Sequence, residues 1–342
     1  MMLELLGHLI KIAAVIGVML GFVAYTVMLE RWACAWMQDR IGPNRVGPFG
    51  VLQPLADGLK FIFKEDVLPH HVNKVYFCIA PVVTMIPGLI AMAVIPWGSN
   101  LPIAGHVIKG VIADLNVGIL FIFAISSLGV YGIVLAGWAS NSKYPFLGGI
   151  RSSAQMISYE VCLGLSVVPV FMQAGSLNLM KVVEYQAAHT WLVLCQPLSF
   201  FIFLVSAFAE TNRTPFDLPE AEQELVGGYH TEYSSMKFAM FFLGEYAAMF
   251  VQSALMVTLF FGGWSLPFAP FNAPATELWV GAVQIGVFLA KVVCFLFLFI
   301  WVRWTIPRFR YDQLMALGWK IFIPLTIVNI LLVAVVLALV AK

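Results

Sequence analysis

The sequence predicts an all-α, polytopic integral membrane protein that forms a single transmembrane helical domain over residues 1–342. Hydrophobic residues make up 61% of the chain and charged residues only 11%, whereas a soluble domain carries about 25% charged residues. The mean hydropathy is +0.91. Apolar stretches of about 20 residues, the length of a membrane-spanning helix, recur along the whole chain. The net charge of +1 argues against nucleic acid as a partner.

Eight segments are long and apolar enough to span a bilayer. In order, they are residues 9–30, 75–97, 113–138, 155–175, 190–210, 238–263, 277–302 and 319–340. The first segment has full length and lacks a preceding basic region, so we expect a retained helix rather than a cleaved signal. With an even number of spans, both termini are expected on one side of the membrane.

Lysine and arginine residues predict how these spans are oriented. Fourteen of the nineteen lie in or beside four inner loops, at about 31–74, 139–154, 210–237 and 303–318, and four lie on the side of the termini. Basic residues are retained in cytoplasmic loops. We therefore expect the inner loops to face the cytoplasm or its equivalent, and both termini to face outward.

Five ionisable residues lie within or at the ends of the apolar segments, all in the half nearest the inner loops. They are Glu30, Glu160, Glu210, Glu245 and Lys291. A charge near the bilayer centre costs about 2.5–3.5 kcal/mol, so such groups usually face a protein interior or a wet cavity. Glu30 and Glu210, at helix ends, could instead reach the membrane surface. We expect the other three to share one charge-coupled, water-containing path, with Lys291 near the midplane.

The cysteines do not indicate a redox centre. All five are isolated and no Cys-x-x-Cys pair occurs, so neither an iron–sulfur cluster nor a zinc site is expected. The glycine fingerprints of dinucleotide and phosphate sites are also missing. We therefore expect no flavin, iron–sulfur cluster, metal or catalytic side chain in this chain.

The first inner loop contains two glycine–proline turns and then a predicted amphipathic helix near residues 50–64. One face is apolar and carries Leu52, Leu55, Leu59, Ile62 and Phe63. A narrow stripe elsewhere is polar and carries Gln53, Asp57, Lys60 and Lys64. A helix lying on lipid headgroups and a helix whose polar stripe lines a cavity explain this pattern equally well.

The third inner loop is acidic. Its carboxylates are Glu210, Asp217, Glu220, Glu222 and Glu224, and its one arginine is Arg213. Apolar residues interrupt the charges, which indicates a packed loop. Packed acids repel one another, which would raise their pKa values towards neutrality and suit them to proton transfer. In the last inner loop, arginines alternate with aromatic residues, a pattern typical of membrane-interface anchors and, less often, of protein docking.

Three long motifs occupy the first, third and last inner loops. They cover residues 40–58, beginning RIGPNRVGPFG, residues 210–222, reading ETNRTPFDLPEAE, and residues 303–314, reading RWTIPRFRYDQL. Together they resemble the complex I membrane subunit called H in bacteria and subunit 1 in mitochondria. The resemblance covers essentially the whole chain, and the eight spans fit it.

The resemblance implies a subunit of a proton-translocating NADH:quinone oxidoreductase, with several passes through a bacterial inner membrane. The family forms the membrane half of a quinone chamber, so ubiquinone or menaquinone is the expected substrate. Its implied partners are peripheral-arm subunits with the terminal iron–sulfur cluster and quinone headgroup site, small and antiporter-like membrane subunits, and membrane lipid.

The resemblance also assigns roles to individual residues. The implied quinone-binding residues are Arg31, Arg40, Asp57, Lys60 and Phe242. The implied proton-coupling residues are Glu30, Glu160, Glu210, Arg213, Asp217, Glu220, Glu222, Glu224, Glu232, Glu245 and Lys291. Two alternatives are an anchor of a related membrane-bound hydrogenase and a free-standing cation transporter. The intact first-loop motif argues against the anchor, and the lack of a convincing internal repeat argues against the transporter.

Overall fold

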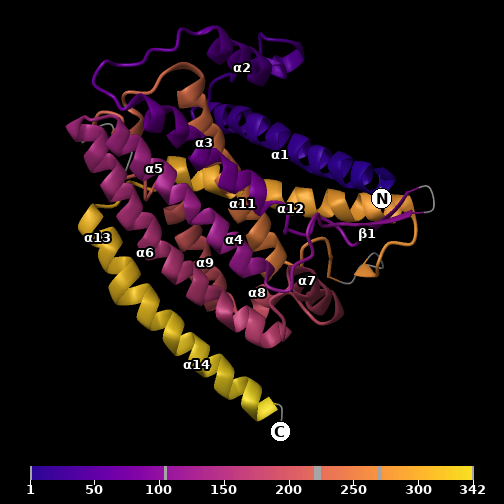
Figure 1. The fold of residues 1–342 in the computed structure, drawn as a ribbon. Coiled ribbons are helices and arrows are strands. Elements are labelled where there is room, and N and C mark those ends of the chain that lie inside the picture. The colour runs from indigo at the N-terminus through magenta and orange to yellow at the C-terminus, as the bar shows by residue number, and fades with distance from the viewer. Residues whose placement is uncertain (1, 104–105, 219–224, 268–271, 341–342) are drawn as a thin grey trace.

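The computed structural model describes residues 2–103, 106–218, 225–267 and 272–340, which are almost entirely helical (Figure 1). The α-helices are α1 (Met2–Met37), α2 (Gln53–Phe63), α3 (Lys74–Ala91), α4 (Gly118–Ser126), α5 (Leu128–Ala139), α6 (Lys143–Ala174), α7 (Leu179–Ala188), α8 (Leu192–Cys195), α9 (Pro197–Glu210), α11 (Ser235–Phe260), α12 (Leu278–Thr305), α13 (Tyr311–Ala316) and α14 (Ile323–Val340). Shorter segments are the 3-10 turns η1 (Pro48–Gly50) and η2 (Gly228–His230) and the π-helical η4 (Leu317–Phe322).

Seven helical segments in the described ranges are long and apolar enough to cross a membrane, with α4–α5 and α13–α14 each counted as one. The segment predicted at 190–210 instead forms two shorter helices, α8 and α9, that meet at Gln196. Pro197 has no amide hydrogen and cannot make the hydrogen bond that would join them. The apolar α9 is 14 residues long, shorter than the seven.

Several helices extend beyond the apolar segments that predicted them. Helix α1 continues to Met37, so Glu30 is not at its end. Helix α6 begins at Lys143, so most of the predicted loop 139–154 is helical. At Gly148 an added Cβ would lie 2.9 Å from the backbone of Gly228. Packing against this neighbouring loop overrides the poor helix propensity of glycine.

Two further differences concern the outer part of the chain and the last inner loop. A two-stranded antiparallel hairpin, β1 (Asn100–Ile103) and β2 (His106–Lys109), departs from the all-α prediction. The predicted loop 303–318 is non-helical only at 306–310. Hydropathy locates apolar helix cores, whereas polar helix ends depend on capping and packing.

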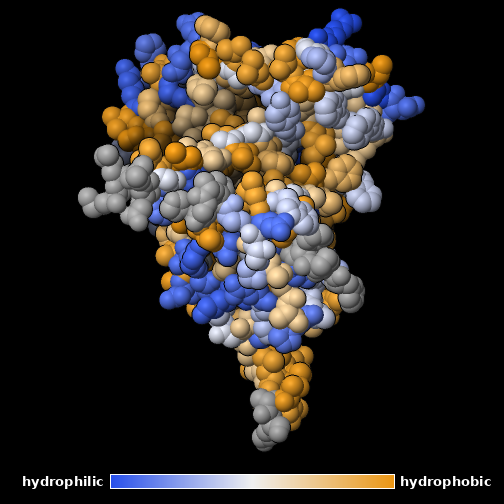
Figure 2. Space-filling model, turned by 90° about the vertical axis from the view of Figure 1, so that its right-hand side faces the viewer, coloured by the Kyte–Doolittle hydropathy of each residue, from blue (hydrophilic) through white to orange (hydrophobic). Residues whose placement is uncertain are grey.

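Helix α11 lies at the centre of the bundle. It packs against α1, α3, α9 and α12, and its sequence is the most buried of the seven spans. Helices α1 and α12 lie side by side, while α6 and α14 run diagonally to them (Figure 1). The C-terminal part of α14 projects from the bundle as a hydrophobic strip (Figure 2).

The connections gather at two opposite ends of the bundle. At one end, here called the inner-loop end, three hydrogen bonds join the loops: Asn73 N to Ala139 O at 3.0 Å, Ser235 Oγ to Lys64 O at 2.8 Å and Phe309 N to Pro215 O at 3.1 Å. At the other, here called the terminal end, two bonds join connections: Asn178 Nδ2 to Asp114 Oδ1 at 2.7 Å and Ser99 Oγ to Gln284 Oε1 at 2.6 Å. The two ends therefore carry different loops and different chemistry.

Candidate functional site

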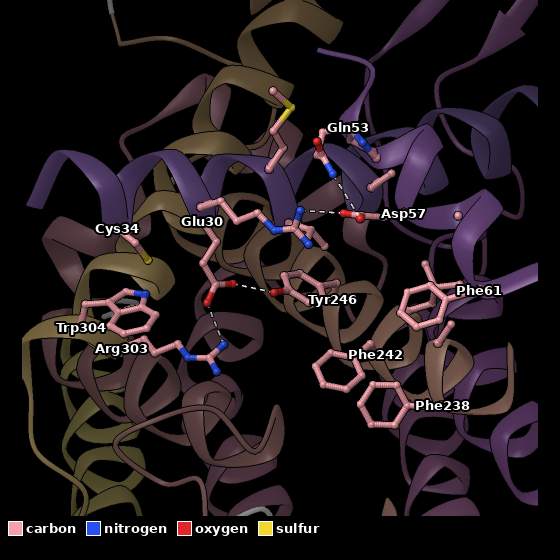
Figure 3. A pocket seen from close by; sticks show the side chains of 18 of the residues that line it. Glu30, Cys34, Gln53, Asp57, Phe61, Phe238, Phe242, Tyr246, Arg303 and Trp304 are labelled. Carbon is pink, nitrogen blue, oxygen red and sulfur yellow. Dashed lines mark hydrogen bonds and ion pairs between the residues drawn. The ribbon is translucent and has the colours of Figure 1, made fainter. Parts of the chain in front are cut away.

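A cavity of about 530 Å³ lies at the inner-loop end, enclosed by α1, α2, α11 and the end of α12. Much of its wall is apolar. The rings of Phe61, Phe238 and Phe242 lie together on one side of it, and Trp304 lies on another (Figure 3). The cavity is large enough for an organic ligand, because ligand pockets usually enclose about 300–1,000 Å³.

The polar rim of this cavity centres on Asp57 of α2. Arg31 Nη1 of α1 lies 2.6 Å from its carboxylate, and Lys60 Nζ lies 3.6 Å from it. Gln53 Nε2 donates to the same carboxylate at 3.3 Å (Figure 3). These contacts tie the amphipathic helix to the long first helix and place a charged group at the cavity mouth.

Four of the five residues proposed for quinone binding line this cavity: Arg31, Arg40, Asp57 and Phe242. The fifth, Lys60, is not among the lining residues, but its ammonium lies beside Asp57. The structure also relates the two interpretations of α2. Its polar stripe contributes to the cavity through Gln53 and Asp57, while its apolar face stays exposed.

The turns before α2 depend on one close backbone approach. At Gly50, φ is +78°, and an added Cβ would lie 2.2 Å from the carbonyl oxygen of Pro43. Only glycine fits there without displacing the chain. This explains the turn-rich sequence that brings Arg40 and the start of α2 to the same cavity.

A buried ion cluster borders the cavity at Glu30. Its carboxylate accepts hydrogen bonds from the hydroxyl of Tyr246 at 2.6 Å, from Arg303 Nη1 at 2.8 Å and from Arg213 Nη1 at 3.1 Å (Figure 3). Glu30 is only 7% exposed. It therefore does not reach the membrane surface, the alternative that its expected place at a helix end had left open.

Arg213 connects this cluster to Glu245. Its side chain is 3% exposed and forms ion pairs with both Glu30 and Glu245. Its guanidinium also lies 4.3 Å from the ring centre of Tyr246. One arginine therefore holds two carboxylates from different helices, and a change of charge on either carboxylate changes the field at the other.

A smaller cavity of about 80 Å³ follows on the far side of Glu245. Glu245 and Glu210 both line it. Glu210 accepts a hydrogen bond from Gln252 Nε2 at 2.7 Å, and Glu160 lies close enough to act on its charge. The structure thus arranges Glu30, Glu245, Glu210 and Glu160 in series from the large cavity into the bundle.

The described part of the acidic loop is packed, as expected. Asp217 is 8% exposed and lies 3.0 Å from Arg308. Burial raises the pKa of Asp217, although the Arg308 charge opposes this shift. The dominant cause is therefore desolvation, not the expected repulsion among acids. Glu232 lies at the surface, 3.9 Å from His71. Glu220, Glu222 and Glu224 lie outside the described residues.

Lys291 lies elsewhere than expected. Its ammonium donates to the carbonyl oxygens of Phe261, Gly263 and Ser265 at 2.7, 2.9 and 2.6 Å. These carbonyls follow the C-terminal end of α11, fifteen or more residues beyond Glu245, which corresponds to about 22 Å along a helix. Carbonyls at a helix end lack intrahelical partners and attract a cation. Lys291 therefore belongs to the terminal end and does not contact the carboxylate series.

Sequence reasoning missed three members of the site. Arg303 was interpreted chiefly as an interface anchor, yet it binds Glu30. Tyr246 and Gln252 are uncharged and were not singled out. A polar residue within an apolar helix, such as Gln252, is a signal that could have drawn attention to it. In the described ranges, no group of three or more His, Cys, Asp or Glu side chains could hold a metal ion.

Comparisons with known proteins agree over nearly the full chain. A sequence model of the family described as NADH dehydrogenase matches residues 10–334. The chain is 52% identical to the second of the H-type subunits of the NADH-quinone oxidoreductase of Koribacter versatilis, over 98% of both chains. It is 50% identical to the first H-type NADH-quinone oxidoreductase subunit of Cytophaga hutchinsonii, over 96% of both. It is 51% identical to NADH-quinone oxidoreductase subunit 8 of Rhodothermus marinus, over 95% of both.

Proposed function

The chain belongs to the NADH dehydrogenase family, whose members include the H-type subunits of NADH-quinone oxidoreductases, and we propose that it supplies the membrane half of a quinone site. It is a membrane subunit of such an oxidoreductase complex. Quinone, as ubiquinone or menaquinone, would be its substrate, and the redox groups would belong to other subunits.

The 530 Å³ cavity is the observation that carries this proposal. Its aromatic and aliphatic wall suits the ring and isoprenoid tail of a quinone, which bind by burial of apolar surface. Asp57 and Arg31 stand at the polar rim, with Arg40 and Lys60 near them. These groups would orient the polar carbonyls of the headgroup as it passes towards a partner subunit.

We further propose that the carboxylate series couples quinone chemistry to proton movement. Arg213 links Glu30 beside the cavity to Glu245, and Glu210 and Glu160 continue the series. Groups that interact this strongly titrate as a set. Asp217 and Glu232 would extend the series into the acidic loop, together with Glu220, Glu222 and Glu224. Lys291, at the other end of α11, is left outside it.

The proposed partners follow from exposed surface at the inner-loop end. Ile41 and Phe49 are 80% and 85% exposed, and large exposed apolar side chains on a polar loop favour a protein contact. Peripheral-arm subunits with the terminal iron–sulfur cluster would complete the headgroup site here. Small and antiporter-like membrane subunits would receive the signal from the carboxylates.

For the topology we propose eight crossings of a bacterial inner membrane. Helices α8 and α9 together cover residues 192–210, which at about 1.5 Å per residue reach roughly 28 Å and nearly match the bilayer core. The basic inner loops would then be cytoplasmic and both termini periplasmic. A tag at the C-terminus should be accessible to protease only from the periplasmic side. Cleavage in sealed right-side-out vesicles is thus expected, and cleavage in sealed inverted vesicles would overturn this topology.

The quinone role is tested with Arg40→Ala and Asp57→Ala in the assembled complex. Quinone reduction should fall about tenfold or more, because the rim that orients the headgroup is lost. NADH oxidation by a water-soluble acceptor should be unchanged, since that acceptor takes electrons at the flavin. Arg310→Ala is the matched control, because Arg310 is 80% exposed and forms an ion pair only with Asp312 among the described residues. Equal loss of both activities in a normally assembled complex would refute the local role.

The coupling role is tested with Glu160→Gln and Glu245→Gln, which keep side-chain shape and remove charge. Quinone reduction and proton pumping should fall together in proteoliposomes. Unchanged pumping in both variants would place the proton path elsewhere. The hydrogenase anchor and the cation transporter gain no support from the three relatives, all named as quinone oxidoreductase subunits.

A further inference from the structure

A second apolar cavity, of about 180 Å³, lies between the same three long helices at the terminal end. Its wall includes Val15 and Met19 of α1, Phe250 of α11 and Phe288 of α12. Phe22 packs on Phe250, with ring centres 5.5 Å apart, and lies along α1 between the two cavities. This cavity is therefore distinct from the proposed quinone site.

Trp97 is the one member of this wall with a polar side-chain group. Its indole Nε1 is fully buried and has no acceptor in the part of the chain that the structure describes. A buried donor without a partner is unfavourable, so an acceptor from a bound molecule would be stabilising. Tryptophan is enriched where the apolar core of a bilayer meets the headgroups, which is also the depth of the ester carbonyls of a phospholipid.

A cluster of lysines adjoins the cavity. Lys11 lies one turn before Ala14 and Val15, on the face of α1 that lines the cavity. Its ammonium donates to the carbonyl oxygen of Val111. The preceding residue, Gly110, accepts a hydrogen bond from the backbone of Trp97 at 2.9 Å. The same short segment therefore holds both the ammonium and the indole at the rim.

The local charge balance favours an anion. Lys109 lies near enough to Lys11 for the two charges to repel. Asp114 pairs with Lys109 at 3.0 Å, but it also accepts from Asn178 and feels the charge of Lys181. One acid among three lysines leaves a net positive rim. Figure 2 faces this side of the molecule, with the hairpin and the N-terminus, and shows hydrophilic residues bordering hydrophobic ones.

We propose that this site binds one anionic phospholipid from the leaflet at the terminal end. An acyl chain would fill the cavity between α1, α11 and α12. An ester carbonyl would accept a hydrogen bond from Trp97 Nε1, and the phosphate would lie beside Lys11 and Lys109. The cavity is too small for a drug-sized molecule but admits part of one chain, and the lysines select for negative charge.

Photo-crosslinking in the purified complex tests the proposal. Phosphatidylglycerol and phosphatidylcholine that carry the same photoreactive acyl chain are added separately in detergent, and labelled peptides are mapped by mass spectrometry. We expect phosphatidylglycerol to label the cavity-lining parts of α1, α11 or α12 at least fivefold more than phosphatidylcholine. Equal labelling by the two lipids, or labelling confined to other helices, would overturn the proposal.

Two variants assign the contacts. Trp97→Phe keeps the apolar shape and removes the donor, and Lys11→Gln with Lys109→Gln removes the charges. Each should lower phosphatidylglycerol labelling several-fold, and the lysine variant should abolish the preference over phosphatidylcholine. Trp36→Phe and Lys64→Gln, exposed at the inner-loop end, are matched controls. If a variant fails to assemble, the comparison of the two lipids in the unmodified complex still decides. Labelling that a quinone competes away would also refute the assignment, because the occupant would then be an isoprenoid tail.

Discussion

Two buried carboxylate sites lie along α11 and differ in what surrounds them. At the first, Glu30 and Glu245 have Arg213 and Arg303 as partners, with the hydroxyl of Tyr246 between them. At the second, two turns along the same helix, Glu210 receives one amide hydrogen bond from Gln252. In the described ranges no ion pair reaches Glu210 within 4.0 Å.

The difference shows that similar residues in similar apolar surroundings can have different roles. A buried ion pair loses much when one partner is removed, because the other charge is left uncompensated. A carboxylate held by one amide loses less when its charge is removed, because an amide can replace its hydrogen bonding. We therefore expect the first site to combine structural and functional importance, and the second to be almost purely functional.

The largest effect is expected for Arg213→Leu. Removing the shared guanidinium leaves Glu30 and Glu245 buried together, which should cost about 3–5 kcal/mol of stability. Assembled complex should decrease strongly, and thermal unfolding in detergent should shift to lower temperature. Arg310→Leu, at an exposed ion pair, should change stability by less than about 0.5 kcal/mol. Comparable losses in the two variants would remove the basis of the comparison.

A third way of holding a charge is tested by Lys291→Met. Three carbonyl oxygens would lose their donor, and each buried acceptor left unpaired costs about 1–3 kcal/mol. With partial relaxation we expect a loss of about 2–4 kcal/mol, measured by thermal unfolding. Pumping per assembled complex should stay close to normal, because Lys291 does not contact the carboxylates. A selective loss of pumping with normal stability would return Lys291 to the coupling series.

A matched pair of neutral variants compares the two sites directly. Glu30→Gln removes the acceptor of two arginine contacts and should destabilise by about 2 kcal/mol, since hydrogen bonds to charged groups contribute about 1.5–3 kcal/mol. Glu210→Gln should change stability by less than about 1 kcal/mol while lowering proton pumping. Stability is measured by thermal unfolding, and pumping in proteoliposomes. The reverse order of stability would show that arginine pairing is not what distinguishes the sites.

The smallest effect at neutral pH is expected for His230, whose ring packs on Phe242 beside the large cavity. Burial lowers the pKa of His230 to about 4. Because the folded-state pKa lies below the unfolded value, about 6.5, this group's contribution to stability is present above about pH 6.5 and lost as pH falls towards 4. His230→Gln should thus match the unmodified protein at pH 7 and lose less stability at pH 5.

The matched control for this pH effect is His70→Gln, because His70 is exposed. Its unfolding temperature should follow that of the unmodified protein across the whole pH range. Parallel curves for the His230 variant and the unmodified protein would contradict the expected burial of the neutral ring.

Much of the candidate site followed from the loop motifs, and the rest depended on helix geometry. The motif resemblance pointed to Arg31, Arg40, Asp57 and Phe242 before any of them could be placed around one cavity. The partners Tyr246 and Gln252 were missed because they are uncharged. Arg303 was interpreted chiefly as an interface anchor because its contact with Glu30 joins residues 273 positions apart. No local pattern specifies such a contact.

The amino-acid sequence by itself determined that this is a membrane protein built from long apolar helices, because only segments that satisfy their own backbone can cross a bilayer. It also determined which rare charges had to be accommodated. Tertiary structure alone decided which of these charges meet. The tilt and rotation of α1, α11 and α12 bring Glu30 to Arg213 and send Lys291 to the opposite end of α11. Helix packing sets those angles, and hydropathy along the chain contains no information about them.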